Sequence, residues 1–446
     1  MVALESPSLW TKPDFRFPTI ALETLKRTGS RPLSLMLNAN LARDVVQQEE
    51  LAIEVLKGYL SQTASLEVKF PTTALERILN TAVGPASLLH TLKLTNCIAI
   101  EAASITLPEN FLGKASSGLR RLSVERFSIP WNSTFLKDLT HLEIISPSGS
   151  TSDFSVSQLG QVLRGCPALE ALSVCSCLSL TGEAIPPVEL PKLCQMDVTA
   201  TMPVLIKVMS SLKLPSSTER QLTVIIDESP VDITRLLRLS LSPEGEQPPK
   251  ELAILSFRRT KESGSYAWSA WDEIPFQGFS KPSFILNFLV RSNFVPPDFG
   301  ECMHTFLEVA PISNLLMLHL DNITSIPPRT IYLLSTLPKL AAFTLNACPG
   351  CESAVIEGLV HPEETGGDAS QPRLPFPSLI SLDLSNVVFG PLPQGVELKS
   401  LLFRNLSFRS KRGARLARLG LTACEGLVKE DMDELKNLVR VVARVD

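Results

Sequence analysis

Cysteines offer the most obvious chemistry in this sequence. Residues 348–351 read Cys-Pro-Gly-Cys, and Cys175 and Cys177 lie two residues apart. Paired thiols at such spacings are typical of disulfide exchange or of half a zinc site. A zinc site needs two further ligands, and the nearest histidines along the chain, His319 and His361, do not stand at a paired ligand spacing. We therefore favour a structural role for these cysteines.

Other catalytic signatures are absent from the sequence. There is no phosphate-cradling glycine loop, no H-E-x-x-H and no G-x-S-x-G. The chain holds 5 histidines, which gives a hidden hydrolase triad no support. We expect a protein that is not an enzyme, with no catalytic residue, cofactor or metal site.

The cysteines belong to a recurring pattern. Residues 169–180 read L-x-x-L-x-V-x-x-C-x-x-L, a leucine-rich-repeat signature of a short strand followed by a tight turn. The same phase, complete or partial, recurs from Leu89, Leu119, Leu139, Leu193, Leu222, Leu252, Leu315, Leu340, Leu379 and Leu416. The turn position is occupied by Cys97, Cys177, Cys348 and Cys424. We interpret these cysteines as turn residues that hold one repeat to the next.

This repetition predicts an α/β leucine-rich-repeat solenoid, or horseshoe, with a parallel β-sheet on its concave side and helices on its convex side. Residues 21–85 are expected to form an N-terminal helical cap and opening strand, and residues 86–430 the repeats. Residues 431–446 are expected to form a C-terminal capping helix. A globular α/β domain would also alternate strands and helices, but it would not repeat this leucine phase so often.

Two insertions interrupt the predicted repeats, near residues 258–282 and 361–373. The first contains Trp268 and Trp271 among glycines, serines and charged residues. It fits either a protruding loop or a folded insertion that covers a mismatch between two parts of the solenoid. The sequence leaves both interpretations open.

Composition narrows the range of partners and compartments. The net charge of -4 gives no basic excess, so we expect no nucleic-acid partner. No apolar run approaches the roughly 20 residues that a membrane helix needs, so we expect no membrane partner. The N-terminus lacks the pattern of a secretory signal, and 9 cysteines cannot all pair within one chain. We therefore expect a cytoplasmic and/or nuclear protein with reduced thiols.

The residues that flank the inner leucines should point away from the core onto the concave face, because side chains alternate along a strand. Charges of both signs mix there with small polar groups, which suits a protein target better than a phosphate backbone. His141, His319 and the two tryptophans are the expected anchors. The candidate partner-binding residues of this face and of the first insertion are Lys93, Arg121, Glu125, His141, Glu143, Asp197, Arg258, Trp268, Trp271, His319, Asp321, Asp383 and Arg418.

The N-terminal run at residues 2–10 reads Val-Ala-Leu-Glu-Ser-Pro-Ser-Leu-Trp. It resembles the last turn of an F-box and the residues after it in fungal, mushroom-type F-box/leucine-rich-repeat proteins. Residues 107–111, residues 119–132 and the cysteine in the repeat turn resemble the same family. By this resemblance, residues 1–20 are a remnant that follows an F-box, whose helical body is not in the sequence.

The family implies the substrate-recognition part of an SCF-type (Skp1-cullin-F-box) ubiquitin ligase adaptor. The solenoid would hold the target protein, and a Skp1-type linker would bind only if an F-box exists upstream. The alternative is a stand-alone protein-interaction scaffold with no ligase link. A secreted recognition protein would instead require a signal peptide upstream.

Overall fold

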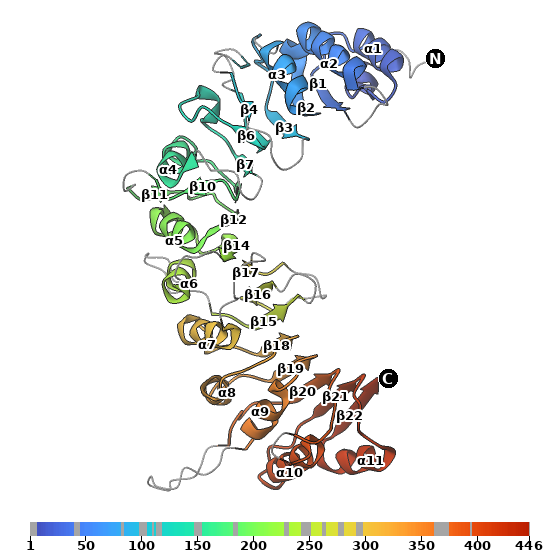
Figure 1. Ribbon diagram of the computed structural model, residues 1–446, viewed down its shortest axis with the longest axis vertical. Helices are drawn as coiled ribbons and strands as arrows, with labels where there is room; N and C mark the ends of the chain where they lie inside the picture. Colours follow the sequence, from blue (N-terminus) through green and yellow to red (C-terminus); the bar gives the residue numbers. More distant parts are fainter. Residues whose placement is uncertain are drawn as a thin grey trace. The chain divides into compact units, whose positions relative to one another are not determined.

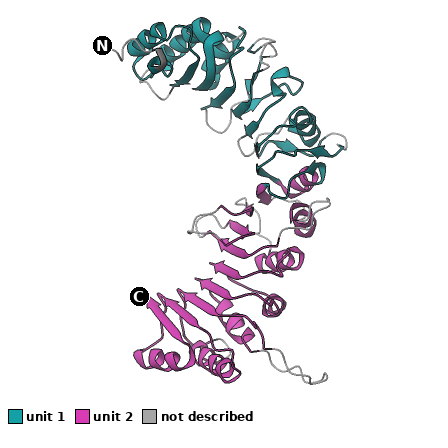
Figure 2. Cartoon of the chain, turned by 180° about the vertical axis from the view of Figure 1, so that it is seen from behind, with its two compact units in different colours: residues 1–200, 210–218 teal, residues 201–209, 219–446 magenta. Residues whose placement is uncertain are grey.

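The computed structural model describes residues 7–39, 45–81, 84–97, 105–108, 111–112, 118–146, 154–181, 186–226, 232–241, 251–260, 265–274, 281–290, 298–360, 374–392 and 395–445. The chain divides into two compact units, which we describe separately (Figure 2). The first comprises Met1–Ala200 and Ser210–Thr218, and the second comprises Thr201–Met209 and Glu219–Asp446. Each unit is mixed α/β, with a largely parallel sheet and helices beside it (Figure 1).

The sheet of the first unit is parallel, and its strands follow one another in chain order. The strands are β1 (Leu33–Asn38), β2 (Thr63–Phe70), β3 (Thr91–Asn96), β5 (Arg121–Glu125), β7 (His141–Ile145), β9 (Ala171–Cys175) and β12 (Gln195–Thr201). The helices are η2 (Pro7–Trp10), α1 (Pro18–Arg27), α2 (Val45–Tyr59), η4 (Leu60–Gln62), α3 (Thr72–Thr81), η5 (Thr134–Leu136) and α4 (Val156–Arg164). Two-residue strands pair outside this sheet, as β4 (Ile105–Thr106) with β6 (Phe127–Ser128), β8 (Phe154–Ser155) with β10 (Leu178–Ser179), and β11 (Val188–Glu189) with β13 (Leu212–Lys213).

The second unit has a sheet in the order β14-β17-β16-β15-β18-β19-β20-β21-β22. Its strands are β14 (Glu219–Ile226), β15 (Ile254–Arg259), β16 (Tyr266–Trp271), β17 (Phe284–Val290), β18 (Met317–Asp321), β19 (Ala342–Asn346), β20 (Ser381–Ser385), β21 (Arg418–Thr422) and β22 (Val441–Val445). Its helices are most of α5 (Met202–Ser211, whose last two residues belong to the first unit), α6 (Ile233–Leu241), α7 (Phe299–Val309), α8 (Pro328–Ser335), α9 (Cys351–Gly358), α10 (Leu398–Lys411) and α11 (Lys429–Leu438). Strand β16 runs antiparallel to both of its neighbours, and the other pairs are parallel.

The predicted leucine phase forms the core. In β18 the second and fourth residues, Leu318 and Leu320, are buried. Leu318 pairs in register with Phe343 of β19, which pairs with Leu382 of β20. Apolar side chains therefore stack in rows across the strands, and this burial is the main force that holds neighbouring strands in register.

A recurring turn follows the strands. The residue after the strand has a left-handed backbone, with φ between 48° and 64°, at Arg126, Ser176, Asn322, Ala347, Asn386 and Ala423. Its N–H donates to a main-chain carbonyl of the next strand. The acceptor is the residue that pairs with the last residue of the strand before the turn. The bonds, of 2.7 to 2.9 Å, join Arg126 to Ile145, Ser176 to Thr199, Asn322 to Asn346, Ala347 to Ser385, Asn386 to Thr422 and Ala423 to Val445.

The turn cysteines form the opposite link, to the strand before. Each Sγ donates to a carbonyl of the preceding strand: Cys177 to Ile144 at 4.0 Å, Cys348 to Leu320 at 3.5 Å and Cys424 to Leu384 at 3.4 Å. The predicted turn role of these three cysteines is confirmed. In the turns at Ser176, Ala347 and Ala423, the two kinds of bond together tie the turn to the strand on either side of it.

Helix α4 shows why the segments between strands become helical. Leu159, Val162 and Leu163 recur at helical spacing and are buried. At its start, the Ser155 hydroxyl accepts from the Gln158 N–H at 3.2 Å, and the Gln158 side-chain oxygen accepts from the Ser155 N–H at 2.8 Å. This capping box satisfies two main-chain donors that the helix leaves open.

The insertion predicted near 258–282 is folded into the sheet of the second unit. Its described part contains β16, and the wholly parallel sheet that we expected is wrong here. Trp268 is 1% exposed and packs edge-on against Phe257, Phe288 and Phe306, with ring centroids 4.8 to 5.5 Å apart. Burial of this aromatic cluster explains why the segment forms a strand instead of a protruding loop.

Both ends of the chain differ from the prediction. At the C-terminal end we expected a helix over 431–446, but α11 ends at Leu438 and β22 continues the sheet. The run from Val439 to Val445 is rich in β-branched valines, which favour a strand. At the N-terminal end, the expected opening strand is β2. A further strand, β1, precedes it along the chain and pairs with it in the sheet. The insertion expected near 361–373 lies outside the described residues.

Candidate functional site

Strand alternation sets polar residues on the face of each sheet opposite its buried core, and we call this side the polar face. In β18 it carries Met317, His319 and Asp321. Other predicted site residues at such positions are Lys93, Arg121, Glu125, His141, Glu143 and Asp197 in the first unit, and Arg258, Asp383 and Arg418 in the second. The structure therefore distributes these residues over two polar faces, one in each unit.

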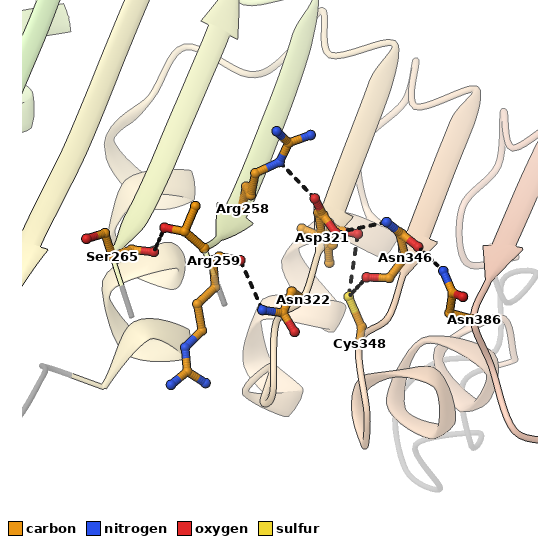
Figure 3. Close-up of polar contacts among 10 residues, drawn as sticks. Arg258, Arg259, Ser265, Asp321, Asn322, Asn346, Cys348 and Asn386 are labelled. Atoms are coloured by element: carbon orange, nitrogen blue, oxygen red, sulfur yellow. Dashed lines mark hydrogen bonds and ion pairs between the residues drawn. The ribbon is translucent and has the colours of Figure 1, made fainter. Parts of the chain in front are cut away.

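A row of hydrogen bonds crosses the polar face of the second unit where its strands end (Figure 3). Arg258 Nε lies 2.8 Å from Asp321 Oδ2, and Asn346 Nδ2 donates to Asp321 Oδ1 at 2.9 Å. Asn386 Nδ2 in turn donates to Asn346 Oδ1 at 2.8 Å. We call Arg258, Asp321, Asn346 and Asn386 the polar ladder. Because its side chains bond to one another, the ladder presents donors and acceptors in fixed positions.

His319 lies beside the ladder, between Ser256 of β15 and Thr344 of β19 in register. Burial lowers the pKa of His319; Asp321 partly offsets that shift, and Arg258 adds to it. The imidazole is therefore neutral at pH 7 and offers one hydrogen-bond donor and one acceptor. His319 is suited to recognise a polar group rather than to pair with a carboxylate.

Asp383 and Arg418 form a second charged pair on this face, with Arg418 Nε 3.4 Å from Asp383 Oδ1. Ser381 Oγ also donates to Asp383 Oδ2 at 3.2 Å. The Asp383 carboxylate lies over Gly420, the residue that pairs with Asp383 in β21. A Cβ at Gly420 would overlap this carboxylate, so glycine is what lets Asp383 lie across the strand.

Apolar side chains gather on the same face as these polar groups, at the other end of the strands. Trp271 pairs with Ile254, which pairs on its other side with Met317. Ile285 of β17 pairs with Ser269, two residues before Trp271. We call Ile254, Trp271, Ile285 and Met317 the Trp271 patch. Met317 is 40% exposed, and the other three are partly exposed.

Trp268 does not belong to this surface. It was expected as a binding anchor together with Trp271, but its ring is buried among the core phenylalanines. The three-residue step from Trp268 to Trp271 explains the difference, because an odd step along a strand changes the face. We therefore exclude Trp268 from the candidate site and retain Trp271.

The polar face of the first unit carries a looser row along the central strand position. Lys93 Nζ lies 3.6 Å from Glu67 Oε1, and Ser123 Oγ donates to Glu143 Oε2 at 2.5 Å. Burial, and then the charge of Glu143, raises the pKa of Asp197. This row therefore contains Lys93 paired with Glu67, a Glu143 carboxylate that accepts a hydrogen bond, and Asp197, whose carboxyl group ionises less readily.

The first row position of the same face includes His141, which pairs with Arg121 of β5. Burial lowers the pKa of His141, Arg121 adds to the shift and Glu170 opposes it. Glu125 lies in the third row, with its Oε1 atom 3.4 Å from Arg126 Nη1. The predicted residues of the first unit therefore lie on three rows of this face and do not form one compact cluster.

The thiols of Cys348 and Cys351 are buried and hydrogen-bonded to main-chain carbonyls. Cys351 Sγ donates to the Ile323 carbonyl at 3.3 Å, and burial raises the pKa of Cys348 to about 11 and that of Cys351 further still. Both thiols are therefore protonated at neutral pH. Within the described parts of the chain, no three histidine, cysteine or acidic side chains are grouped to hold a metal ion.

Several residues of the site were missed from the sequence. Asn386 follows β20 and joins the ladder only because the left-handed turn directs it there. The roles of Gly420, Ile254 and Ile285 depend on which strand lies beside each of them. The repeat pattern alone did not identify these neighbouring strands. The signal that would have found Ile254 and Ile285 was the period-two alternation of their strands.

Comparison with known families and curated proteins identifies no relative whose function bears on this chain. No protein-family model matches the sequence, and a search of curated proteins finds no significant match. Among the helices of the described segments, none is both long enough and apolar enough to cross a bilayer.

Proposed function

We propose that this chain is a leucine-rich-repeat solenoid that binds a protein partner on the polar face of its second unit. The observation that carries the proposal is that the Trp271 patch lies on the same face as the polar ladder, at the opposite end of strands β15 and β18. Tryptophan, methionine and arginine are enriched at protein interfaces, where a few aromatic anchors supply most of the binding energy. The patch supplies such an anchor, and the ladder supplies directional polar contacts.

Three features support the repeat interpretation and a binding role. Apolar side chains stack in rows from strand to strand, and the same turn bond recurs after successive strands. The polar groups of the ladder are held by one another, so little conformational freedom is lost when a partner binds. We further propose a reducing compartment, cytoplasmic and/or nuclear, because the nine cysteines, all of them described, are unpaired.

A site-specific crosslinker tests the binding face. A photoreactive amino acid at Ser269, between Trp271 and Ile285, should capture a partner, and the same group at Tyr332 of α8 should not capture that partner. Trp271→Ala should then weaken binding of the captured protein by about tenfold or more, the effect typical of an interface hot spot. Tyr332→Ala, which removes a side chain that is 59% exposed on the helical side, is the matched control. An equal loss of affinity in both variants would show that the partner does not bind at the Trp271 patch.

A ubiquitin-ligase adaptor is the specific form of this function that we propose. Its support is the F-box-like run at the N-terminus, whose last residue is held against α1. Thr28 Oγ1 donates to the Trp10 carbonyl at 3.0 Å, and the Arg27 guanidinium lies 5.5 Å from the centroid of the Trp10 ring. An F-box that precedes Trp10 would be joined to the first unit through this fixed contact. A stand-alone scaffold remains the alternative.

Binding to a Skp1-type linker separates the two forms. The 446-residue chain should fail to retain the linker in a pull-down, and the same chain preceded by an in-frame upstream F-box should retain it. If the extended chain also fails, the adaptor proposal falls and the stand-alone scaffold stands.

A further inference from the structure

One row on the polar face of the second unit carries uncharged side chains with open hydrogen-bonding groups. Ser269 of β16 pairs in register with Ser256 of β15, which also pairs with His319 of β18. His319 pairs in turn with Thr344 of β19. We call these four residues the neutral row. All four are partly exposed, and among the described residues none of their side chains makes a hydrogen bond.

The neutral row runs between the Trp271 patch and the polar ladder. On β18, Met317 of the patch comes two residues before His319, and Asp321 of the ladder comes two residues after it. Asp321 is already bonded to Arg258 and Asn346 (Figure 3). The charged groups of the ladder are therefore occupied, and the neutral row offers the open hydrogen-bonding groups closest to the apolar patch.

His319 is the largest member of the neutral row and sets what a partner must supply there. Its uncharged ring offers one donor and one acceptor. Met317, on the apolar side, is roughly 6.6 Å away along the strand, the rise of two residues. A side chain that contacts both must join an apolar body of this length to an uncharged tip that can donate or accept a hydrogen bond.

Tyrosine meets these requirements better than the other side chains. Its ring is an apolar body and its hydroxyl both donates and accepts, whereas the tryptophan N–H only donates. The thioether of Met317 favours contact with an aromatic ring. A charged side chain would lose water without gaining an open counterion, because Arg258 and Asp321 are bonded to each other.

We propose that the partner presents a tyrosine to this face, with its ring against the Trp271 patch and its hydroxyl hydrogen-bonded to His319. This inference rests on the proposed function, because it assigns a residue type to the partner of the same face. The indole of Trp271 gives the ring an aromatic neighbour. Phenylalanine at the same position would keep that contact and leave the imidazole without a hydrogen bond.

A library of random peptides displayed on phage tests the residue type. The 446-residue chain is the bait, and Trp271→Ala is used for counter-selection, so that only peptides that need the Trp271 patch are retained. We expect the retained peptides to share a tyrosine. Failure to retain any peptide contradicts the binding face itself and this inference with it. Retained peptides that share no tyrosine overturn this inference alone.

Exchange of the shared tyrosine for phenylalanine then tests the contact with His319. The exchange should weaken binding to the unaltered chain by about two- to tenfold, the effect of one net hydrogen bond, measured by fluorescence anisotropy. His319→Leu should bind both peptides equally, whereas His319→Gln, which keeps a donor and an acceptor, should still prefer tyrosine. His141→Leu, on the polar face of the first unit, is the matched control and should keep the full preference.

The peptide exchange leaves the protein unaltered, so it decides the matter even if His319→Leu does not fold. Equal affinity of the tyrosine and phenylalanine peptides for the unaltered chain overturns the inference. A preference for tyrosine that persists undiminished in folded His319→Leu also overturns it, because the hydroxyl would then bond elsewhere.

Discussion

At the scale of single residues, Trp268 and Trp271 show how three positions along a strand separate a core residue from a surface residue. Trp268 is enclosed by Phe257, Phe288 and Phe306, and Trp271 lies on the opposite face beside Ile254. Stability and binding are therefore expected to divide cleanly between two tryptophans of the same strand.

Trp268→Ala should lower the free energy of unfolding by roughly 3–5 kcal/mol, the cost of removing a large aromatic side chain from a packed core. Trp271→Ala should cost less than half as much, because its ring is only partly buried. Urea unfolding of the two variants, followed by circular dichroism, provides the measurement. Similar losses in both would show that Trp268 is not the centre of the cluster.

The buried thiols give the stability of the protein a dependence on pH in the alkaline range. Burial raises the pKa of Cys177 to about 12 and that of Cys348 to about 11. The folded state therefore holds these protons at a pH where unfolded thiols, with a pKa near 9, begin to lose them.

The stabilising effect of these protonated thiols is fully present below pH 9. Above it, the free energy of unfolding should fall by up to about 1.4 kcal/mol per pH unit for each buried thiol, until the pH reaches the raised pKa. Urea titrations at pH 8, 9 and 10 measure the slope, and Cys348→Ala should reduce it.

At pH 8 a thiol reagent should modify the exposed Cys194 well before Cys177 or Cys348. Rapid modification of Cys348 would contradict this prediction.

At the scale of strands and turns, neighbouring elements determine what a residue can be. Asp383 lies over Gly420 of the next strand, and Asn386 reaches Asn346 because its turn has a left-handed backbone. These side-chain positions are therefore set in pairs. A substitution in one strand should change the effect of a substitution in the next.

Gly420→Ala provides a direct test of this coupling. The added Cβ displaces the Asp383 carboxylate from Arg418, so the variant should be destabilised by about 1 kcal/mol. With Asp383→Ala already present, the same change should stabilise the strand by roughly 0.5–1 kcal/mol, because alanine replaces a flexible glycine. The four proteins of this double-mutant cycle are compared by denaturant unfolding. The same sign in both backgrounds would show that the two residues are not coupled.

The elements of the core could be predicted from the sequence because buried leucines repeat in a fixed phase. The phase places Leu318 and Leu320 inside, and with them His319 and Asp321 outside. It could not show that β16 enters the sheet, because glycines, serines and charges around Tyr266–Trp271 are typical of loops. The polar ladder could not be predicted either, since its bonds depend on which strand lies beside which.

At the scale of the whole chain, the charged groups of the polar faces are largely matched within each face. Arg258 pairs with Asp321, Arg418 with Asp383 and Lys93 with Glu67. The net charge of -4 is small for 446 residues. Long-range attraction of a charged partner is therefore expected to be weak.

Partner affinity should consequently change by less than about threefold between 50 and 500 mM salt, because screening acts mainly on charges that lack a nearby counterion. The measurement is a titration of the captured partner at both salt concentrations, with Asp321→Asn as the comparison. This variant leaves Arg258 without its carboxylate, so its binding should become more sensitive to salt. A strong salt dependence of the unaltered chain would indicate an electrostatic mode of recognition.

The turn that follows the strands also bears on how such a chain can evolve. Its joints are made by main-chain N–H and carbonyl groups, which are common to nearly every residue type, and in three turns also by a cysteine that bonds to the strand before. A strand and turn copied or exchanged by recombination would meet the same joints on both sides. Neighbouring strands and turns can therefore differ in ancestry, and the polar face can acquire new residues one strand at a time without loss of these main-chain joints.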